Sequence, residues 1–203
     1  SSDLLSIRFH KPPRVVLNPN DGPEHPHWLP GAEFNIVESC FQAPADATAI
    51  VFRGPNQPLS SWSYAHLLSR VRQVAAAIRA AGFKEGEALA VVLPMTAESV
   101  AIYLGIIWAG CAVVSIADSF APPEIASRLR IANARAVLTY DVQIRSGKKL
   151  PLYDRVAEAT THPIICLPNS AEGKLEIILR REHLRDRKST RLNSSHLVIS
   201  YAV

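Results

Sequence analysis

The residues best suited to chemistry lie in the segment 144–152, which reads IRSGKKLPL. Arg145 and Lys148 stand on either side of Gly147, and a turn at this glycine would direct both cations toward one phosphate. A guanidinium binds a phosphate through two parallel hydrogen bonds, and an ammonium adds a point charge. Clusters of basic residues are more often exposed loops that bind nothing. The spacing alone therefore favours a solvated loop and leaves phosphate binding as the alternative.

Other residues with chemical potential have weaker support. His25 and His27 lie two positions apart without a third ligand nearby, so we expect an ordered loop rather than a metal site. Asp118 follows a predicted strand, where ligands of open α/β sheets gather, but we expect it to cap the next turn. The segment 188–190, KST, lacks the glycines that let a backbone approach phosphates closely. We therefore predict no catalytic residue and no metal ligand.

The elements that position these residues centre on the segment 89–140. Three apolar, β-branched runs alternate with two helix-like segments at a spacing typical of βαβ units. Thr96 is placed to cap the first helix and Gly110 to end it, and Pro122 and Pro123 begin the second. Since strands that are apolar on both faces must be covered by helices on both sides, we predict an α/β fold with a mostly parallel sheet. The predicted strands are 89–93, 112–117 and 136–140.

The remaining pattern predicts further elements around this framework. Ser63 is placed to cap a helix that ends near Ala81 and has one apolar face. Tyr103 and Trp108 fall among apolar positions, so we expect both in the core. Residues 1–33 are rich in proline, which is typical of an extended leader. We also predict a short helix at 34–41, a hairpin at 48–53 and 59–62, a polar loop at 141–152, and strands at 164–167 and 172–180.

Composition and charge exclude several classes of protein. The formal net charge is +4, but the whole excess lies in 180–203, so it does not indicate nucleic-acid binding by the folded part. The three cysteines are far apart and have no metal-type spacing, which favours a reduced, intracellular protein. The segment 99–117 carries no charge and is long enough for a membrane span, but Gly105 and Gly110 interrupt it. We therefore expect a buried helix followed by a buried strand.

Several segments together resemble AMP-forming acyl-CoA synthetases. WSYAHL at 62–67 is similar to a helix start in that superfamily, and EGEALAVVLPM at 85–95 is similar to a turn followed by a strand. GCAVVS at 110–115 is similar to the strand after that. WLPGAEFNI at 28–36 resembles the acetyl-CoA synthetase branch, and SIADSFAP at 115–122 resembles plant-type acyl-activating enzymes. These likenesses follow the family's order over most of the chain.

The resemblance implies an enzyme, an AMP-forming ligase that joins a small-molecule carboxylic acid to CoA through an acyl-adenylate. It implies ATP, Mg and CoA as cofactors, an incomplete adenylation domain at 34–180, and an intracellular location in the cytoplasm or the peroxisome. The segment 144–152 resembles a loop of acetyl-CoA synthetases whose two cations contact the nucleotide end of CoA. By this likeness Arg145, Ser146, Gly147 and Lys148 bind CoA. Lys148 stands where that family has arginine, so its charge is kept and bidentate geometry is lost.

Two features limit the expected activity. The family's phosphate loop, which combines glycine, serine and threonine with a lysine, has no counterpart in the sequence. We therefore expect that the chain alone adenylates no acid. The segment 186–203, DRKSTRLNSSHLVISYAV, resembles a translated sequencing adapter. We expect it to be a foreign, disordered tail whose apolar end, 197–203, has no partner strand.

Two other functions are consistent with the same residues. One is a stand-alone module that binds CoA or a nucleotide through Arg145 and Lys148. The other is an adenylation unit of a different branch, luciferase-like or from a peptide synthetase, which shares the fold and the first chemical step. The likeness of 28–36 and 144–152 to acetyl-CoA synthetases argues against that second alternative.

Overall fold

The computed structural model describes residues 6–19, 22, 24–54, 58–145, 147–167, 177–180 and 197–199. Backbone contacts divide the chain into two compact units, Ser1–Pro44 and Ala45–Val203. The predicted α/β framework lies entirely in the second unit.

The first unit holds a two-stranded antiparallel ladder and one short helix. β1 (Leu17–Asn18) pairs with β2 (His27–Trp28), which adds regular structure to the proline-rich segment. The predicted short helix is confirmed as the four-residue α1 (Ile36–Ser39). Asn35 is its N-cap and accepts a hydrogen bond from the helix backbone at 3.1 Å.

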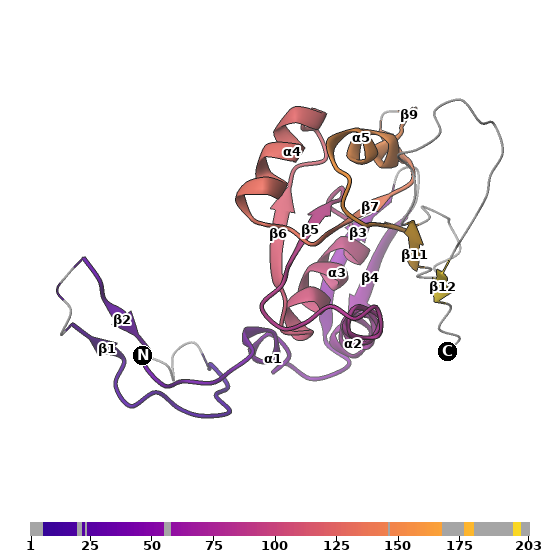
Figure 1. Cartoon of the computed structure of the whole chain (residues 1–203). Helices are drawn as coiled ribbons and strands as arrows, with labels where there is room; N and C mark the ends of the chain where they lie inside the picture. Colours follow the sequence, from indigo (N-terminus) through magenta and orange to yellow (C-terminus); the bar gives the residue numbers. More distant parts are fainter. Residues whose placement is uncertain are drawn as a thin grey trace. The chain divides into compact units, whose positions relative to one another are not determined.

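A six-stranded sheet forms the centre of the second unit (Figure 1). Four strands run parallel in the order β10, β7, β5, β6, which confirms the predicted parallel sheet. β11 and β12 continue the sheet beyond β10 as antiparallel strands. The bounds are β5 (Ala88–Val92), β6 (Ala112–Ile116), β7 (Ala136–Tyr140), β10 (Ile164–Leu167), β11 (Ile177–Arg180) and β12 (Leu197–Ile199).

β12 corrects one expectation about the end of the chain. The apolar end was expected to have no partner strand, but β12 pairs with β11 in antiparallel register. An apolar, β-prone segment satisfies its backbone hydrogen-bonding groups when it joins the edge of a sheet. The rest of the expected tail, 186–196 and 200–203, lies outside the described residues, as do residues 172–176 of the strand predicted at 172–180.

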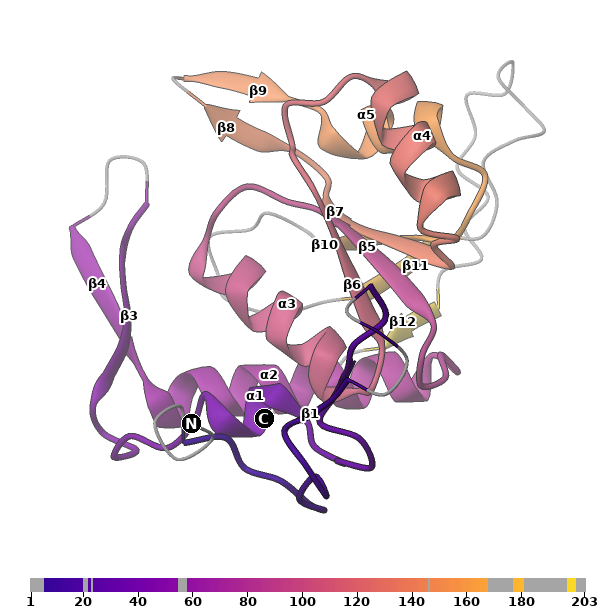
Figure 2. The same ribbon diagram turned by 90° about the vertical axis from the view of Figure 1, so that its left-hand side faces the viewer.

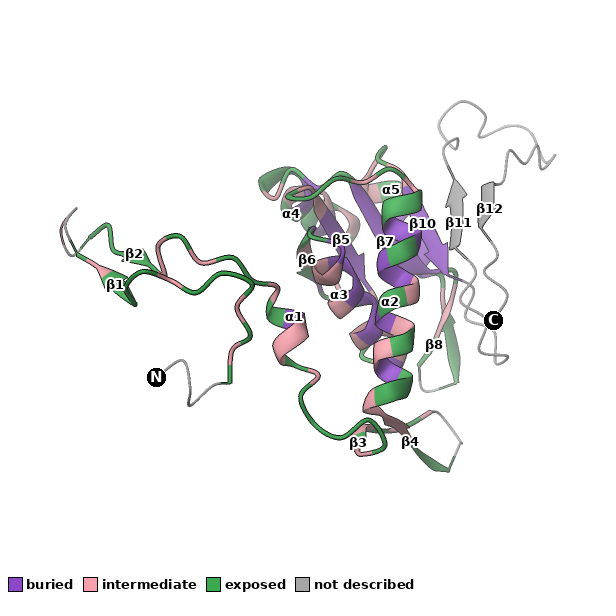
Figure 3. Cartoon of the chain, turned by 90° about the horizontal axis from the view of Figure 1, so that it is seen from below, coloured by how far each residue is buried: buried purple, intermediate pink, exposed green. Residues whose placement is uncertain are grey.

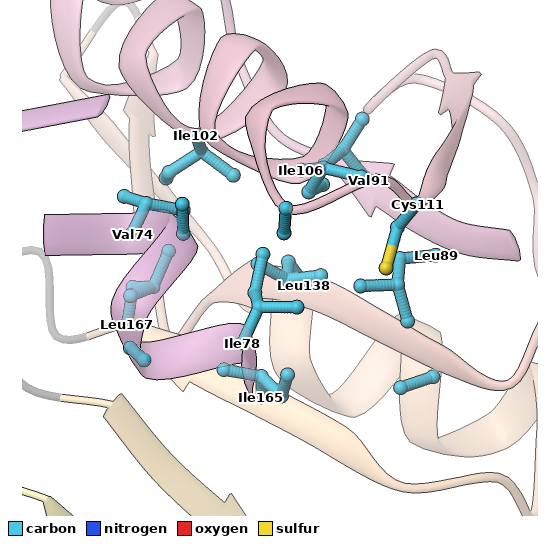
Figure 4. Packing of buried hydrophobic residues seen from close by; sticks show 14 of the residues in the cluster. Val74, Ile78, Leu89, Val91, Ile102, Ile106, Cys111, Leu138, Ile165 and Leu167 are labelled. Carbon is cyan, nitrogen blue, oxygen red and sulfur yellow. The ribbon is translucent and has the colours of Figure 1, made fainter. Parts of the chain in front are cut away.

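Two helices cover each face of the parallel strands (Figure 1). Alternate strand residues point to opposite faces, so Leu138 packs on the first face and Val137 on the second. All five residues of β7 are buried, as predicted for a strand covered on both sides. Figure 4 shows the first cluster, in which Leu138 packs near Ile78 and Ile165. The helices are α2 (Tyr64–Ala80) and α3 (Ala97–Trp108) on the first face, and α4 (Pro122–Ile131) and α5 (Leu152–Ala159) on the second.

The predicted signals at the helix ends are confirmed. Thr96 Oγ1 accepts a hydrogen bond from the Ser99 N–H at 3.1 Å, and Ser99 Oγ accepts one from the Thr96 N–H at 2.9 Å. Ser63 Oγ accepts a hydrogen bond from the His66 N–H at 3.2 Å at the start of α2. Gly110 follows α3 with φ at 87°, a left-handed conformation that favours glycine.

α2 and α3 approach each other closely at Gly105. A Cβ atom added to Gly105 would lie 2.5 Å from Val74 Cβ and 3.0 Å from the Val71 carbonyl oxygen. Packed interiors have no room for such an atom, so glycine allows the two backbones to come this close. Figure 3 shows that α2 has a buried side and an exposed side along its length.

One of the two predicted core aromatics differs from expectation. Tyr103 is 39% exposed, so its assignment to the core is wrong. The buried positions of α3 include Ala101 and Gly105, and a step of about 100° per residue turns Tyr103 away from them. Trp108 is half-buried and packs against the cluster between α3 and the sheet.

The prediction of a polar loop at 141–152 is wrong. β8 (Gln143–Arg145) and β9 (Lys148–Leu150) form an antiparallel hairpin, and α5 begins at Leu152. Strands of three mostly polar residues lack the hydrophobic alternation from which strands are predicted. The other predicted hairpin is confirmed as β3 (Thr48–Arg53) and β4 (Leu59–Ser63).

The uncharged segment 99–117 is a helix followed by a strand, as predicted. It contains most of α3 and all of β6. Within the residues that the structure describes, no helix is both long and apolar enough to cross a membrane.

Candidate functional site

The carboxyl ends of the parallel strands gather the candidate site residues at one edge of the sheet. β5 ends at Val92, β6 at Ile116 and β7 at Tyr140, and neighbouring parallel strands end at the same edge. The β8–β9 hairpin leaves the sheet just after β7, and α5 follows directly (Figure 2). Ligands of open α/β sheets bind outside the carboxyl ends of the strands. This edge is therefore the candidate functional site.

Arg145 and Lys148 face each other at the tip of the hairpin. They are register partners, and both are exposed. Residues directly opposite in an antiparallel pair project from the same face with Cβ atoms about 5 Å apart, and like charges there repel each other. Among the described residues, neither cation lies within ion-pairing distance of a carboxylate. The structure thus brings the two predicted cations together where a bound anion would relieve their repulsion.

Gly147 lies at the tip of the hairpin, just before β9. Its φ of 75° is left-handed, which explains why glycine is suited to this position. A Cβ atom at Gly147 would meet no atom within 4 Å, so the turn rather than close packing requires the glycine. Ser146, the remaining residue predicted to bind CoA, lies outside the described residues.

The hairpin is held at its base by the backbone and by α5. The Asp141 carbonyl oxygen, just before β8, accepts a hydrogen bond from the Tyr153 N–H at 3.3 Å. Val156 is fully buried and anchors α5 in the second cluster. Arg155 Nη1 donates a hydrogen bond to the Asp118 carbonyl oxygen at 2.7 Å. Sequence reasoning missed Arg155, because its partner is a backbone atom 37 residues away and no local pattern marks such a contact.

Asp118 lies at this edge of the sheet, as predicted, two residues after β6. The partner that the structure gives it is Arg155, which binds the backbone carbonyl of Asp118. The turn that follows is closed by a hydrogen bond from the Phe120 N–H to the Ala117 carbonyl oxygen at 3.2 Å. Capping of this turn by the Asp118 carboxylate stays a prediction.

A pair of hydroxyl groups lies at the same edge. The hydroxyl oxygens of Tyr140 and Thr96 are 3.2 Å apart. Burial raises the pKa of the Tyr140 hydroxyl above its ordinary value, the hydrogen bond with Thr96 lowers it, and the Glu98 carboxylate raises it again. The pair is neutral at physiological pH and ties the start of α3 to the end of β7. The sequence signal for it is a buried strand that ends in tyrosine, whose hydroxyl needs a partner.

The two histidines considered as metal ligands belong to the first unit. His27 lies in β2, and His25 lies in the segment just before it. In the part of the chain that the structure describes, no three His, Cys, Asp or Glu side chains are grouped to hold a metal ion. The sheet edge offers two cations and backbone groups, which suit a ligand that carries phosphate.

Comparison with known proteins extends this assignment. Residues 37–197 match the family model described as AMP-binding enzyme. The chain is 42% identical over 189 residues to the probable acyl-activating enzyme 18, peroxisomal, of Arabidopsis thaliana, covering 89% of the chain and 25% of that protein. It is 39% identical over 180 residues to hexanoyl-CoA synthase of Cannabis sativa, covering 84% of the chain and 25% of that protein. It is 30% identical over 160 residues to acetyl-coenzyme A synthetase of Cupriavidus metallidurans, covering 76% of the chain and 24% of that protein.

The chain thus spans about a quarter of the length of the curated relatives that it matches. Its fold is similar to that of acetoacetyl-CoA synthetase from Streptomyces lividans, with a TM-score of 0.74 and 23% identity, over 85% of this chain and 28% of that one. This likeness supports the predicted α/β fold with four parallel strands between helices. The family model and the relatives confirm the predicted family. The chain belongs to the AMP-binding enzymes, the family of plant acyl-activating enzymes and acetyl-CoA synthetases.

Proposed function

We propose that the chain is part of an AMP-forming carboxylate–CoA ligase, in which residues 34–180 form part of the adenylation domain. In this reaction a carboxylate attacks the α-phosphate of ATP, which gives an acyl-adenylate and pyrophosphate, and the CoA thiol then takes the acyl group and releases AMP. Mg²⁺ neutralises charge on the ATP phosphates in such reactions. The names of two relatives, hexanoyl-CoA synthase and acetyl-coenzyme A synthetase, support an acid and CoA as substrates.

Within this function we assign Arg145 and Lys148, together with Ser146 and Gly147, to the phosphates of CoA. The observation that carries this assignment is the position of the two cations directly opposite each other at an exposed hairpin tip. Arg145 offers parallel N–H donors to phosphate oxygens, and Lys148 adds a mobile charge. A phosphate between them replaces a repulsive pair by two attractive contacts.

Calorimetric titration of the whole chain with CoA tests this assignment. We expect saturable binding that weakens about tenfold or more when Arg145→Ala and Lys148→Ala are combined, because charge-assisted hydrogen bonds are lost. Lys149→Ala is the matched control, since Lys149 pairs with Ile144 and projects from the other face of the hairpin. Pantetheine, which lacks the nucleotide phosphates, should bind no better to the wild type than to the double variant. Equal CoA affinities for the wild type and the double variant would contradict the assignment.

Adenylation is tested separately by exchange of labelled pyrophosphate into ATP in the presence of hexanoate or acetate. We propose that the 203-residue chain alone shows no acid-dependent exchange, because its sequence has no glycine-rich phosphate loop with a lysine. Robust exchange by the purified chain would overturn this part of the proposal. It would not affect the assignment of Arg145 and Lys148 to the CoA phosphates.

We further propose a peroxisomal location. Two relatives from Arabidopsis thaliana, the probable acyl-activating enzymes 17 and 18, are named as peroxisomal, at 41% and 42% identity. Co-localisation of the tagged full-length protein with a peroxisomal marker is the expected result. A diffuse cytoplasmic signal would contradict it.

A further inference from the structure

Arg155 joins two parts of the sheet edge that are distant in sequence. Its side chain is half-buried on α5, and Nη1 donates a 2.7 Å hydrogen bond to the carbonyl oxygen of Asp118. Asp118 belongs to the loop 117–121, which connects β6 to α4. A guanidinium hydrogen bond to a carbonyl oxygen is directional and is shielded here by partial burial, so it fixes how α5 lies against this loop.

The first turn of α5 also forms the base of the β8–β9 hairpin. Leu150 ends β9, and α5 starts at Leu152, so one residue separates the hairpin from the helix. The Tyr153 N–H binds the Asp141 carbonyl oxygen across this base. A shift of the first turn of α5 therefore shifts both strands of the hairpin, and with them the two cations at its tip (Figure 2).

The loop 117–121 is itself held on its other side by α4. The Arg128 guanidinium lies 4.0 Å from the centroid of the Phe120 ring, a cation–π contact. Arg128 Nη1 also donates to the Glu124 carbonyl oxygen at 3.1 Å, which holds the guanidinium on α4. The loop is thus fixed from α4 by one arginine and can serve as a firm partner for Arg155 on α5.

We propose that Arg155 is a positioning residue for the phosphate-binding hairpin: by holding α5 to the loop after β6, it fixes the direction in which Arg145 and Lys148 project. This inference rests on the proposed assignment of these two cations to CoA. Arg155 acts through them and needs no contact with the ligand. Binding geometry for a phosphate is demanding, so a small change in the hairpin's direction lowers affinity while the fold stays intact.

The test is calorimetric titration of the whole chain with CoA in a double-mutant cycle. Arg155→Met removes the hydrogen bond and keeps most of the side-chain volume, and we expect CoA affinity to fall about three- to tenfold. In the background of Arg145→Ala with Lys148→Ala, the same substitution should cause no further loss. Arg155→Lys, which keeps a donor and the charge, should restore most of the affinity. Arg130→Met removes an exposed arginine from α4 and is the charge-matched control, with CoA affinity within about twofold of wild type.

Each outcome decides one claim. An unchanged CoA affinity in Arg155→Met, with wild-type binding intact, overturns the positioning role alone. An equal loss in the Arg145→Ala and Lys148→Ala background also overturns it, because Arg155 then acts independently of the two cations. If Arg155→Met does not fold, as judged by circular dichroism, Arg155→Gln replaces it in the cycle, and Arg155→Lys stays the variant that should keep most of the affinity. Absence of saturable CoA binding by the wild type overturns the proposed CoA site together with this inference.

Discussion

The arginines on the two faces of the parallel sheet bind different kinds of partner, a helix on one face and a loop on the other. On the α2–α3 face the buried cluster is apolar, and the helices cross at Gly105 with no room for a methyl group. The arginines of this face join helix to helix: Arg79 Nη2 on α2 donates a hydrogen bond to the Trp108 carbonyl oxygen at 2.7 Å, and Arg72 lies 5.7 Å from the centroid of the Trp108 ring at the end of α3. On the α4–α5 face, apolar contacts are joined by two arginines that hold the loop after β6. Arg128 stacks on Phe120, and Arg155 binds the carbonyl oxygen of Asp118.

This difference separates stability from positioning. Apolar contacts resist changes in volume, but they are not directional and do not aim a side chain. Hydrogen bonds and cation–π contacts to a loop depend on direction, so they determine where the loop and its neighbours lie. We infer that the α2–α3 face supplies more of the stability and that the α4–α5 face positions the candidate site. The predictions below test this division.

Leu138→Ala should lower the free energy of unfolding by about 2–5 kcal/mol, because it leaves a cavity in a packed core. Leu138 is 1% exposed and lies between the sheet and the α2–α3 helices. Urea unfolding followed by circular dichroism measures the change. Arg155→Met should lower stability by only about 1 kcal/mol, as expected for one hydrogen bond. The division between the faces would be contradicted if Leu138→Ala weakened CoA binding by the folded protein more than Arg155→Met does.

Gly105→Ala should lower the free energy of unfolding by about 1–3 kcal/mol, because the new Cβ atom would lie 2.5 Å from Val74 Cβ. The sign of the change in stability is informative, because in an isolated helix alanine is more favourable than glycine by about 1 kcal/mol. Thermal unfolding measures the effect. Ser69→Ala, on the exposed side of α2, is the control and should leave stability equal or slightly higher. Stabilisation by Gly105→Ala would mean that the helices do not cross closely.

The α2–α3 face is also where sequence reasoning succeeds best. Buried strands such as β7 have continuous apolar runs, and caps such as Thr96 and Gly110 act within a few residues of their position. These signals are local, so the sequence alone predicts them. Tyr103 is the exception, because an apolar neighbourhood in sequence does not say which side of a helix a residue occupies.

The α4–α5 face and the hairpin are harder to predict. β8 and β9 are short and mostly polar, and their pairing depends on the turn at Gly147 rather than on hydrophobic alternation. Arg145 and Lys148 were identified by residue type, but only the register shows that they face each other. The contact of Arg155 with a distant carbonyl has no sequence signal, because every residue carries a carbonyl group.

Gly147→Ala should weaken the hairpin by about 1 kcal/mol, because an L-residue is strained at φ of 75°. Since no atom lies within 4 Å of the new Cβ position, we attribute the whole effect to the backbone. The melting temperature of the chain should stay nearly unchanged, whereas CoA affinity should fall several-fold. Gly147→Asn should be milder, because asparagine tolerates the left-handed region. A large fall in melting temperature would show that the hairpin stabilises the core and is not only a carrier of the two cations.

The α2–α3 face also holds two buried acids whose pKa values are raised, the Cys111 thiol and the Tyr140 hydroxyl. Burial is the main cause in both, so each group favours the folded state while it is protonated. That contribution is complete below the ordinary values of 9.0 and 10.0, and it is lost as the pH rises through the higher folded pKa values. Stability should therefore fall above about pH 9.

Tyr140→Phe separates the contribution of the hydroxyl from that of the thiol. At pH 7 the variant should be less stable by about 1 kcal/mol, because the hydrogen bond with Thr96 is lost. The deficit should shrink as the pH rises above 10, because only the wild type must then keep a phenol protonated in the core. Urea unfolding at pH 7, 9 and 10.5 measures both effects. Cys111→Ala is the companion variant, in which the free energy of unfolding should depend less on pH near pH 9. A deficit that stays constant with pH would show that the Tyr140 hydroxyl ionises equally in the folded and unfolded chains, and that the alkaline sensitivity of this face has another source.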